Sequence, residues 1–317
     1  MFSMFTHDHM VEEKGEQDDQ STASAHAAVM VKEVLENLQP EVEGTYVDAT
    51  LGMGWHAKAL LKMIGQKGRL IGIDKDRRSL EMAKDNLKEY SHQCEFVHGH
   101  FCHLDQILKE KHIDRVNGVL LDLGISSFQL NNQARGFSFQ HEGPLDMRIN
   151  QDAALTAFDL INSLSEFEIA KILRDFGEER FYQRIARNIV KSRALSPIRT
   201  TKDLCEIILR SMPAGARRQK IHPATRSFQA FRIAVNHELE EIDVGLDKCM
   251  DLLKPSGRIV VLAFHSLEDR IVKQKFRLFA NMGIAEILTK KPLRPTQKEI
   301  EQNSRARSAR LRGVRRL

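Results

Sequence analysis

Two glycines close to acidic residues make VDATLGMGWHA, residues 47–57, the first candidate for chemistry. A predicted strand runs into Gly52 and Gly54, and a predicted helix follows them. Glycines let the backbone approach a ligand, and the N-terminus of a helix favours negative charge. Asp74 ends the next predicted strand, about 20 residues further on, where a carboxylate can accept hydrogen bonds from ribose hydroxyls. The pattern indicates a site for a nucleoside-containing cofactor.

The spacing alone does not choose that cofactor. Residues 52–57 also fit the GxGxxA fingerprint of dinucleotide-binding loops, so an NAD-dependent oxidoreductase is an open alternative. Asp48 favours S-adenosylmethionine, because it stands at the strand end where dinucleotide loops usually carry their first glycine. The large insertion after Asp122 also favours a methyltransferase.

Alternating strands and helices must position these residues. Their order predicts a parallel sheet with helices on both faces, which is an α/β fold. We expect the first strands at 46–49, 70–73, 95–98 and 118–122, and the first helices at 29–38, 56–64, 78–90 and 104–111. The sheet would be completed near the end of the chain by a strand at 258–263, a helix at 267–281 and two final strands at 284–288 and 309–314.

The alternation stops after Asp122, and residues 155–253 read as helical almost throughout. We therefore expect a sheet domain that is interrupted by a helical insertion. The predicted division is a disordered acidic tail at 1–24, a sheet domain at 25–130 and 234–317, and the insertion at 131–233.

The insertion contains a predicted amphipathic helix with a basic stripe. Its apolar side holds Phe181, Ile185, Ile189 and Val190, and its basic stripe holds Arg180, Arg184, Arg187 and Lys191. A second basic segment follows at Arg217, Arg218 and Lys220. A solvated surface is the alternative interpretation, but two such segments favour contact with RNA.

Composition narrows the class of protein. The chain of 317 residues has a net charge of +5, with local excesses of +9 over 174–232 and +7 over 286–317, which suggests a polyanionic partner. Its longest strongly apolar run, 259–264, is too short to cross a membrane. The four cysteines form no CxxC pair, and the histidines between 98 and 112 lack zinc-site spacing, so we expect a reduced cytoplasmic protein without a metal site.

Five segments carry a resemblance to a known family. The chain resembles the MraW/RsmH family of small-subunit ribosomal RNA (cytosine-N4)-methyltransferases from about residue 25 to about residue 312. The segments are LLDLGISSFQLNNQARGFSFQHEGPLDMR (120–148), GEERFYQRIARNIV (177–190), HPATRSFQAFRIAVNHEL (222–239), FHSLEDRIVK (264–273) and NSRARSARLR (303–312).

The resemblance implies a class I, Rossmann-like methyltransferase fold with an inserted helical domain, and S-adenosylmethionine as cofactor. It implies that the 16S rRNA of the small ribosomal subunit is methylated at N4 of cytosine 1402, in standard numbering, in the decoding region. Neither a DNA partner nor an oligomeric state is implied. The implied cofactor-binding residues are Gly54, Trp55, His56, Asp74, Phe101, Asp122 and Gln129.

The loop departs from the family pattern, because Trp55 stands where the family carries a second glycine. If that position needs a positive φ, a tryptophan is strained; otherwise the ring can cover the cofactor or enter the core. A non-catalytic RNA-binding or assembly factor is therefore a second alternative.

The sequence leaves the catalytic acceptor open as well. The Asp-Pro-Pro-aromatic tetrad of many amino-methyltransferases is absent after Asp122, which itself remains a candidate. The other candidates, on segments expected at the carboxyl edge of the sheet, are Asp146, Arg148, His265, Glu268 and Asp269.

Overall fold

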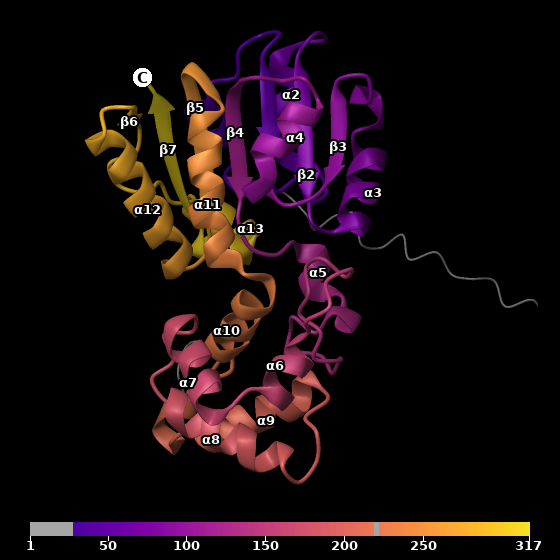
Figure 1. The fold of residues 1–317 in the computed structure, drawn as a ribbon, viewed down its shortest axis with the longest axis vertical. Coiled ribbons are helices and arrows are strands. Elements are labelled where there is room, and N and C mark those ends of the chain that lie inside the picture. Colours follow the sequence, from indigo (N-terminus) through magenta and orange to yellow (C-terminus); the bar gives the residue numbers. More distant parts are fainter. Residues whose placement is uncertain (1–27, 219–221) are drawn as a thin grey trace, which may run out of the picture.

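The computed structural model describes residues 28–218 and 222–317, which contain one seven-stranded sheet in the upper half of the molecule (Figure 1). The strand order is β3-β2-β1-β4-β5-β7-β6, with β1 to β5 parallel and β7 antiparallel to both of its neighbours. This topology confirms the predicted Rossmann-like methyltransferase fold. The strands are β1 (Thr45–Asp48), β2 (Arg69–Asp74), β3 (Cys94–His98), β4 (Val116–Asp122), β5 (Leu253–Ala263), β6 (Ala285–Ile287) and β7 (Arg310–Arg316).

Helices cover both faces of the sheet, so its central strands are apolar on both sides, as buried parallel strands require. One face packs against α1 (Val31–Leu38), α2 (Trp55–Ile64) and α3 (Arg77–Asn86). The other face packs against α4 (Leu104–Glu110), α11 (Glu238–Asp251) and α12 (Ser266–Asn281). None of the helices in the described ranges combines the length and apolar character that a membrane crossing requires.

The insertion lies below the sheet in Figure 1 and has a hydrophobic core of its own. Capping boxes at Thr156, Ser165 and Thr200 begin three of its helices, as side-chain oxygens there satisfy free backbone N–H groups. The helices are α6 (Ala157–Ser163), α7 (Glu166–Asp175), α8 (Tyr182–Arg193), α9 (Thr201–Ser211) and α10 (Thr225–Asn236). The predicted acidic tail and Lys220 lie outside the described residues.

The predicted amphipathic helix is α8. Ile185 and Ile189 are fully buried in the insertion core, whereas Arg184, Arg187 and Lys191 are exposed. The predicted domain boundary at residue 234 falls in the last turn of α10. We propose His237 as the boundary instead, because its left-handed backbone, with φ 51°, separates α10 from α11.

Buried Asp76 joins the insertion to the sheet domain. Arg135, only 2% exposed, donates from Nη1 to Asp76 Oδ2 at 2.7 Å and from Nη2 to the carbonyls of Arg148 and Ile149 at 2.8 Å. Gln129 Nε2 donates to the same Asp76 oxygen at 2.9 Å. The segment that follows β4 is thus anchored to the end of β2.

We expect Arg135→Met to lower the free energy of unfolding by about 3–5 kcal/mol, because it leaves the buried Asp76 carboxylate without its cation. Arg187→Met removes an exposed ion pair with Glu166 and should cost about 0–1 kcal/mol. Urea unfolding measures both. Equal losses in the two variants would contradict the anchoring role of Arg135.

Candidate cofactor site

A pocket opens at the carboxyl edge of the sheet, where the strand order reverses between β1 and β4. Open α/β sheets bind their ligands at such a switch point. Six of the seven predicted cofactor residues line the pocket, and Gly54 is not among the lining residues. The six are Trp55, His56, Asp74, Phe101, Asp122 and Gln129.

Backbone hydrogen bonds shape the glycine loop at the pocket floor. Gly52 N donates to Asp74 Oδ2 at 2.7 Å, and Asp122 N donates to Thr50 Oγ1 at 2.6 Å. Gly54 has a φ of 80° and precedes the first residue of α2. A Cβ on Gly54 would lie 2.9 Å from the Leu87 side chain, so the position requires glycine for conformation and for space.

Trp55 is neither strained nor buried in the core. It occupies the first position of α2, where helical backbone suits any L-residue, and its side chain lines the pocket with 39% exposure. The strain that a positive φ would have caused is therefore absent. Contact between the Trp55 ring and a cofactor remains a prediction.

Three strands end in an aspartate at this edge of the sheet: Asp74 and Asp122 line the pocket, whereas Asp48 is not a lining residue. Asp48 is 1% exposed, and burial raises its pKa to about 7, with neighbouring Asp122 and Asp74 adding to the rise and His56 opposing it. Burial also raises the pKa of Asp122, although His56 Nδ1 lies 3.4 Å from its Oδ2. Asp122 Oδ1 is buried, and the described part of the chain provides no hydrogen-bond partner for it.

This charge distribution fits S-adenosylmethionine better than a dinucleotide. Five carboxylates line the pocket against two cations, Lys75 and Arg305. S-adenosylmethionine carries a sulfonium and an ammonium group, which a pocket lined mainly by carboxylates would attract. The pyrophosphate of NAD would meet the same carboxylates and be repelled. The carboxylates are Asp74, Asp122, Glu238, Glu241 and Glu268.

Phe101 and Gln129 form walls of the pocket from opposite sides. Phe101 is 5% exposed, and its ring packs so closely on α11 that a Cβ on Gly245 would lie 2.3 Å from it. Gln129 belongs to a capping box with Ser126 and donates to Asp76. Its side-chain hydrogen bonds therefore hold the wall in place.

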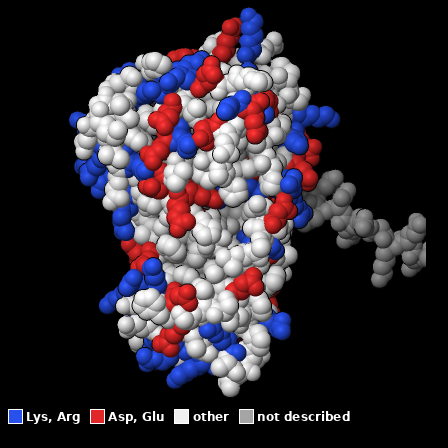
Figure 2. Space-filling view, viewed as in Figure 1, with Lys and Arg blue, Asp and Glu red and all other residues white. Residues whose placement is uncertain are grey.

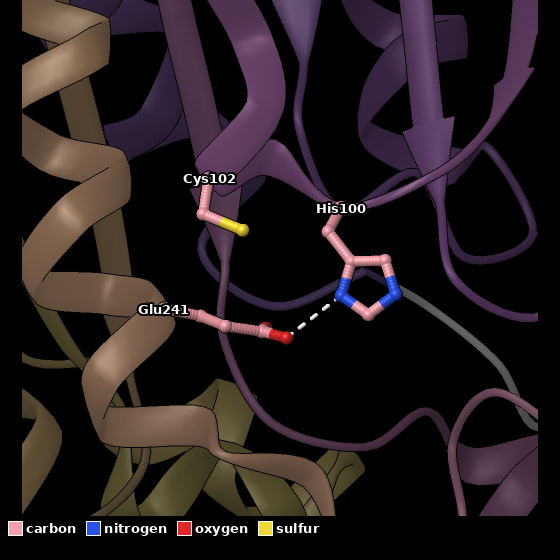
Figure 3. Close-up of side chains that lie close together, drawn as sticks. All are labelled: His100, Cys102 and Glu241. Carbon is pink, nitrogen blue, oxygen red and sulfur yellow. Dashed lines mark hydrogen bonds and ion pairs between the residues drawn. The ribbon is translucent and has the colours of Figure 1, made fainter. Parts of the chain in front are cut away.

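The Glu241 carboxylate, which lies beside Cys102, is held by His100 and Lys75. His100 Nδ1 lies 2.7 Å from Glu241 Oε1 (Figure 3). Lys75 forms an ion pair with Glu241 Oε2. Burial acts to raise the pKa of Glu241, but His100 and Lys75 outweigh it and lower the pKa. His100, Cys102 and Glu241 have ligand-type atoms within 4.8 Å of one another, yet the Lys75 ammonium would repel a divalent cation there.

Only some of the candidate catalytic residues lie at the pocket. Asp146 lies outside the pocket, and its carboxylate accepts two hydrogen bonds from Arg148, at 2.9 Å and 2.7 Å. His265 begins α12, where its Nδ1 accepts from Glu268 N at 3.3 Å, and it is not a lining residue either. Asp269 accepts from Arg310 and Arg312. Of the acceptor candidates, Asp122 and Glu268 remain at the pocket.

The sequence did not predict the part of the site that comes from distant segments. Glu238 and Glu241 reach the pocket from α11, and Arg305 reaches it from the segment after α13 (Gln297–Gln302). Glu238 and Arg305 lie in two of the resembling motifs, but their spacing gave no sign of a ligand. Only the packing of α11 and of the C-terminal segment brings them to the edge of the sheet.

The raised pKa of Asp48 predicts a pH-dependent stability. Because the folded-state pKa exceeds the ordinary value, this contribution is full below about pH 4 and is lost as the pH rises through about 7. The free energy of unfolding should therefore fall from pH 5 to pH 8, and Asp48→Asn should reduce the slope. Urea unfolding at each pH measures it, with Asp114→Asn at an exposed site as control. An unchanged slope in Asp48→Asn would refute this assignment.

Comparison with known proteins agrees with this geometry. The family model described as the MraW methylase family matches residues 23–317. Among solved structures, an rRNA methylase from Streptococcus thermophilus is 10% identical to this chain, and the match covers 90% of this chain and 93% of that one with a TM-score of 0.41.

Curated relatives are much more similar. Ribosomal RNA small subunit methyltransferase H from Syntrophotalea carbinolica is 46% identical over 308 residues, covering 92% of this chain and 98% of that protein. The protein of the same name from Clostridium botulinum (strain Kyoto / Type A2) is 43% identical, covering 92% and 99%. With a family model that spans nearly its whole length and relatives this similar, the chain belongs to the MraW methylase family.

Proposed function

We propose that this protein transfers a methyl group from S-adenosylmethionine to N4 of a cytosine in the decoding region of 16S rRNA, at position 1402 in standard numbering. The observation that carries the proposal is membership of the MraW methylase family combined with an anionic pocket at the switch point of the sheet. The relatives' name supports small-subunit rRNA as the substrate.

The chemistry requires close positioning. The lone pair of cytosine N4 is delocalised into the ring, so the amine must be held in line with the methyl group. When bound, S-adenosylmethionine supplies that methyl group on a positively charged sulfur. The protein's contribution is the placement of hydrogen-bond acceptors at the amine in a site shielded from water. The base must also leave its stack, which suits single-stranded or locally opened RNA.

We further propose that the insertion binds the rRNA. Lys and Arg side chains lie along the lower rim of the molecule, over the insertion (Figure 2). On α8, Arg184 and Lys191 are exposed and have no ion-pair partner among the described residues, while Arg187 pairs with Glu166 at 3.5 Å. Cations that are not neutralised by protein carboxylates remain available to phosphates. The substrate would then be the small ribosomal subunit, in the cytoplasm.

The two alternatives fit these observations less well. An oxidoreductase would have to place a pyrophosphate against the pocket carboxylates, and the chain's family is one of methylases. A non-catalytic factor was suggested by the departure at Trp55, but that residue adopts helical backbone without blocking the loop. Both alternatives are decided by the measurement below.

We expect methyl transfer from labelled S-adenosylmethionine to small ribosomal subunits that lack this modification. Nucleoside mass analysis should then find N4-methylcytidine at the decoding-region cytosine. A known member of the family serves as positive control. Label in another nucleoside, or binding of NAD without S-adenosylmethionine, would reject the proposal, and RNA binding with no cofactor affinity would favour the non-catalytic factor.

The basic stripe of α8 predicts a second result. Changing Arg184, Arg187 and Lys191 together to Glu should raise the KM for small subunits by at least about tenfold, because each lost phosphate contact weakens RNA binding. The affinity for S-adenosylhomocysteine, measured by calorimetry, should stay constant, since the stripe is remote from the pocket.

A matched control makes the same charge change on the sheet domain, at exposed Lys62, Lys88 and Lys109. If this control raises the KM as much as the α8 variant does, net charge rather than the stripe governs RNA binding. The increase for the α8 variant should also diminish at high salt, where phosphate contacts contribute less.

A further inference from the structure

A buried carboxylate follows β5 and leaves one oxygen without a hydrogen bond at the pocket wall. The Glu268 side chain is 1% exposed, and its Oε2 accepts the backbone N–H groups of Phe264 at 2.7 Å and His265 at 3.2 Å. His265 Nε2 lies 3.0 Å from Oε1 as an ion-pair partner, and no hydrogen bond to Oε1 is found among the described residues. Unsatisfied buried acceptors are costly, so such an atom indicates a missing partner.

A second unpaired acceptor lies at the end of the adjacent strand. Asp122 Oδ1 is also buried without a hydrogen-bond partner within residues 28–218 and 222–317, and both residues line the same pocket. The two carboxylates are close enough for the charge of Glu268 to add to the effect of burial in raising the pKa of Asp122. Gly124 lies beside Glu268 Oε1, and its φ of 91° is a left-handed conformation that favours glycine.

Glu268 is held in its ionised form. Burial acts to raise its pKa, but His265, Arg232 and the backbone N–H groups outweigh burial and lower the pKa. Arg232 Nη2 lies 3.9 Å from Glu268 Oε1 and pairs mainly with Glu238. The ionised Glu268 carboxylate can therefore accept a further hydrogen bond at Oε1.

We propose that Glu268 Oε1 and Asp122 Oδ1 accept the two N–H groups of the exocyclic amine of the target base. This inference rests on the proposed function and deepens it, by naming the residues that orient N4 and select cytosine. The predicted cofactor residues Asp74 and Phe101 lie on the β2 and β3 side of the pocket, and Asp122, at the end of β4, stands between that side and Glu268 after β5.

The same pair would reject uracil. Uracil carries a carbonyl oxygen where cytosine carries its amine, and that oxygen would face two carboxylate acceptors with no hydrogen to share. A site built to receive N–H donors discriminates strongly against an analogue that lacks them, because the buried acceptors then stay unpaired.

Glu268→Gln tests the proposal with little change in shape. The glutamine oxygen can still accept the N–H groups of Phe264 and His265, so α12 should begin as before, but the second acceptor becomes a donor. We expect kcat for small subunits to fall about a hundredfold, as when an aimed hydrogen bond is lost. The affinity for S-adenosylhomocysteine should change less than about twofold, because the β1–β2 edge of the pocket is not altered.

Glu178→Gln is the matched control, because Glu178 contacts Ser266 and Arg270 on the same helix from outside the pocket. Its kcat should equal that of the unaltered protein. If Glu268→Gln also keeps full kcat, the inference is overturned. A role confined to structure would instead lower the melting temperature and weaken S-adenosylhomocysteine binding without a selective loss in kcat.

If Glu268→Gln does not fold, the unaltered protein decides the question. Small subunits with uridine at the target position should compete at least about tenfold more weakly than unmodified subunits with cytosine. Equal competition would overturn the inference. Failure of the unaltered protein to form N4-methylcytidine would instead reject the proposed function, so the two failures are distinguishable.

Discussion

The buried carboxylate of Asp76 is the interaction on which the arrangement of the site depends. It stands just after β2 and receives Gln129 and Arg135 from the segment that follows β4. Arg135 in turn holds the carbonyls of Arg148 and Ile149, where the chain enters the insertion. Because a buried charge tolerates little change in its partners, one side of the pocket and the entry to the insertion are fixed together.

The protein neutralises only part of the negative charge around the pocket. Parallel strands bring their carboxyl ends to one edge, and here β1, β2 and β4 each end in an aspartate. Burial raises the pKa of all three, which means that the folded protein is destabilised when they ionise. A cationic ligand lowers that cost, so the electrostatics of the pocket favour S-adenosylmethionine.

The insertion is coupled to the chemistry through α10. Arg232, near the end of that helix, pairs with Glu238 at the start of α11 and lies 3.9 Å from Glu268. Asn236, in the last turn of the helix, hydrogen-bonds to Ile149 N and to the carbonyl of Met147. Helix α10, which belongs to the insertion, thus also contacts the carboxylates Glu238 and Glu268 at the β5 side of the pocket.

Much of this protein could be predicted from the sequence, because local patterns carry the information. Apolar runs predicted the strands, the spacing of basic and apolar residues predicted α8, and the glycine loop with Asp74 indicated a cofactor site. Five long motifs pointed to the family to which the chain belongs.

Only the tertiary structure decided which side chains meet. Asp146 and Glu268 were both candidates in the sequence, but the Arg148 guanidinium pairs with Asp146, whereas no hydrogen bond to Glu268 Oε1 is found among the described residues. Trp55 was ambiguous until its backbone conformation was known. These outcomes depend on contacts between residues far apart in the chain and on whether a charged atom is left unpaired, and no local pattern of residue types encodes either.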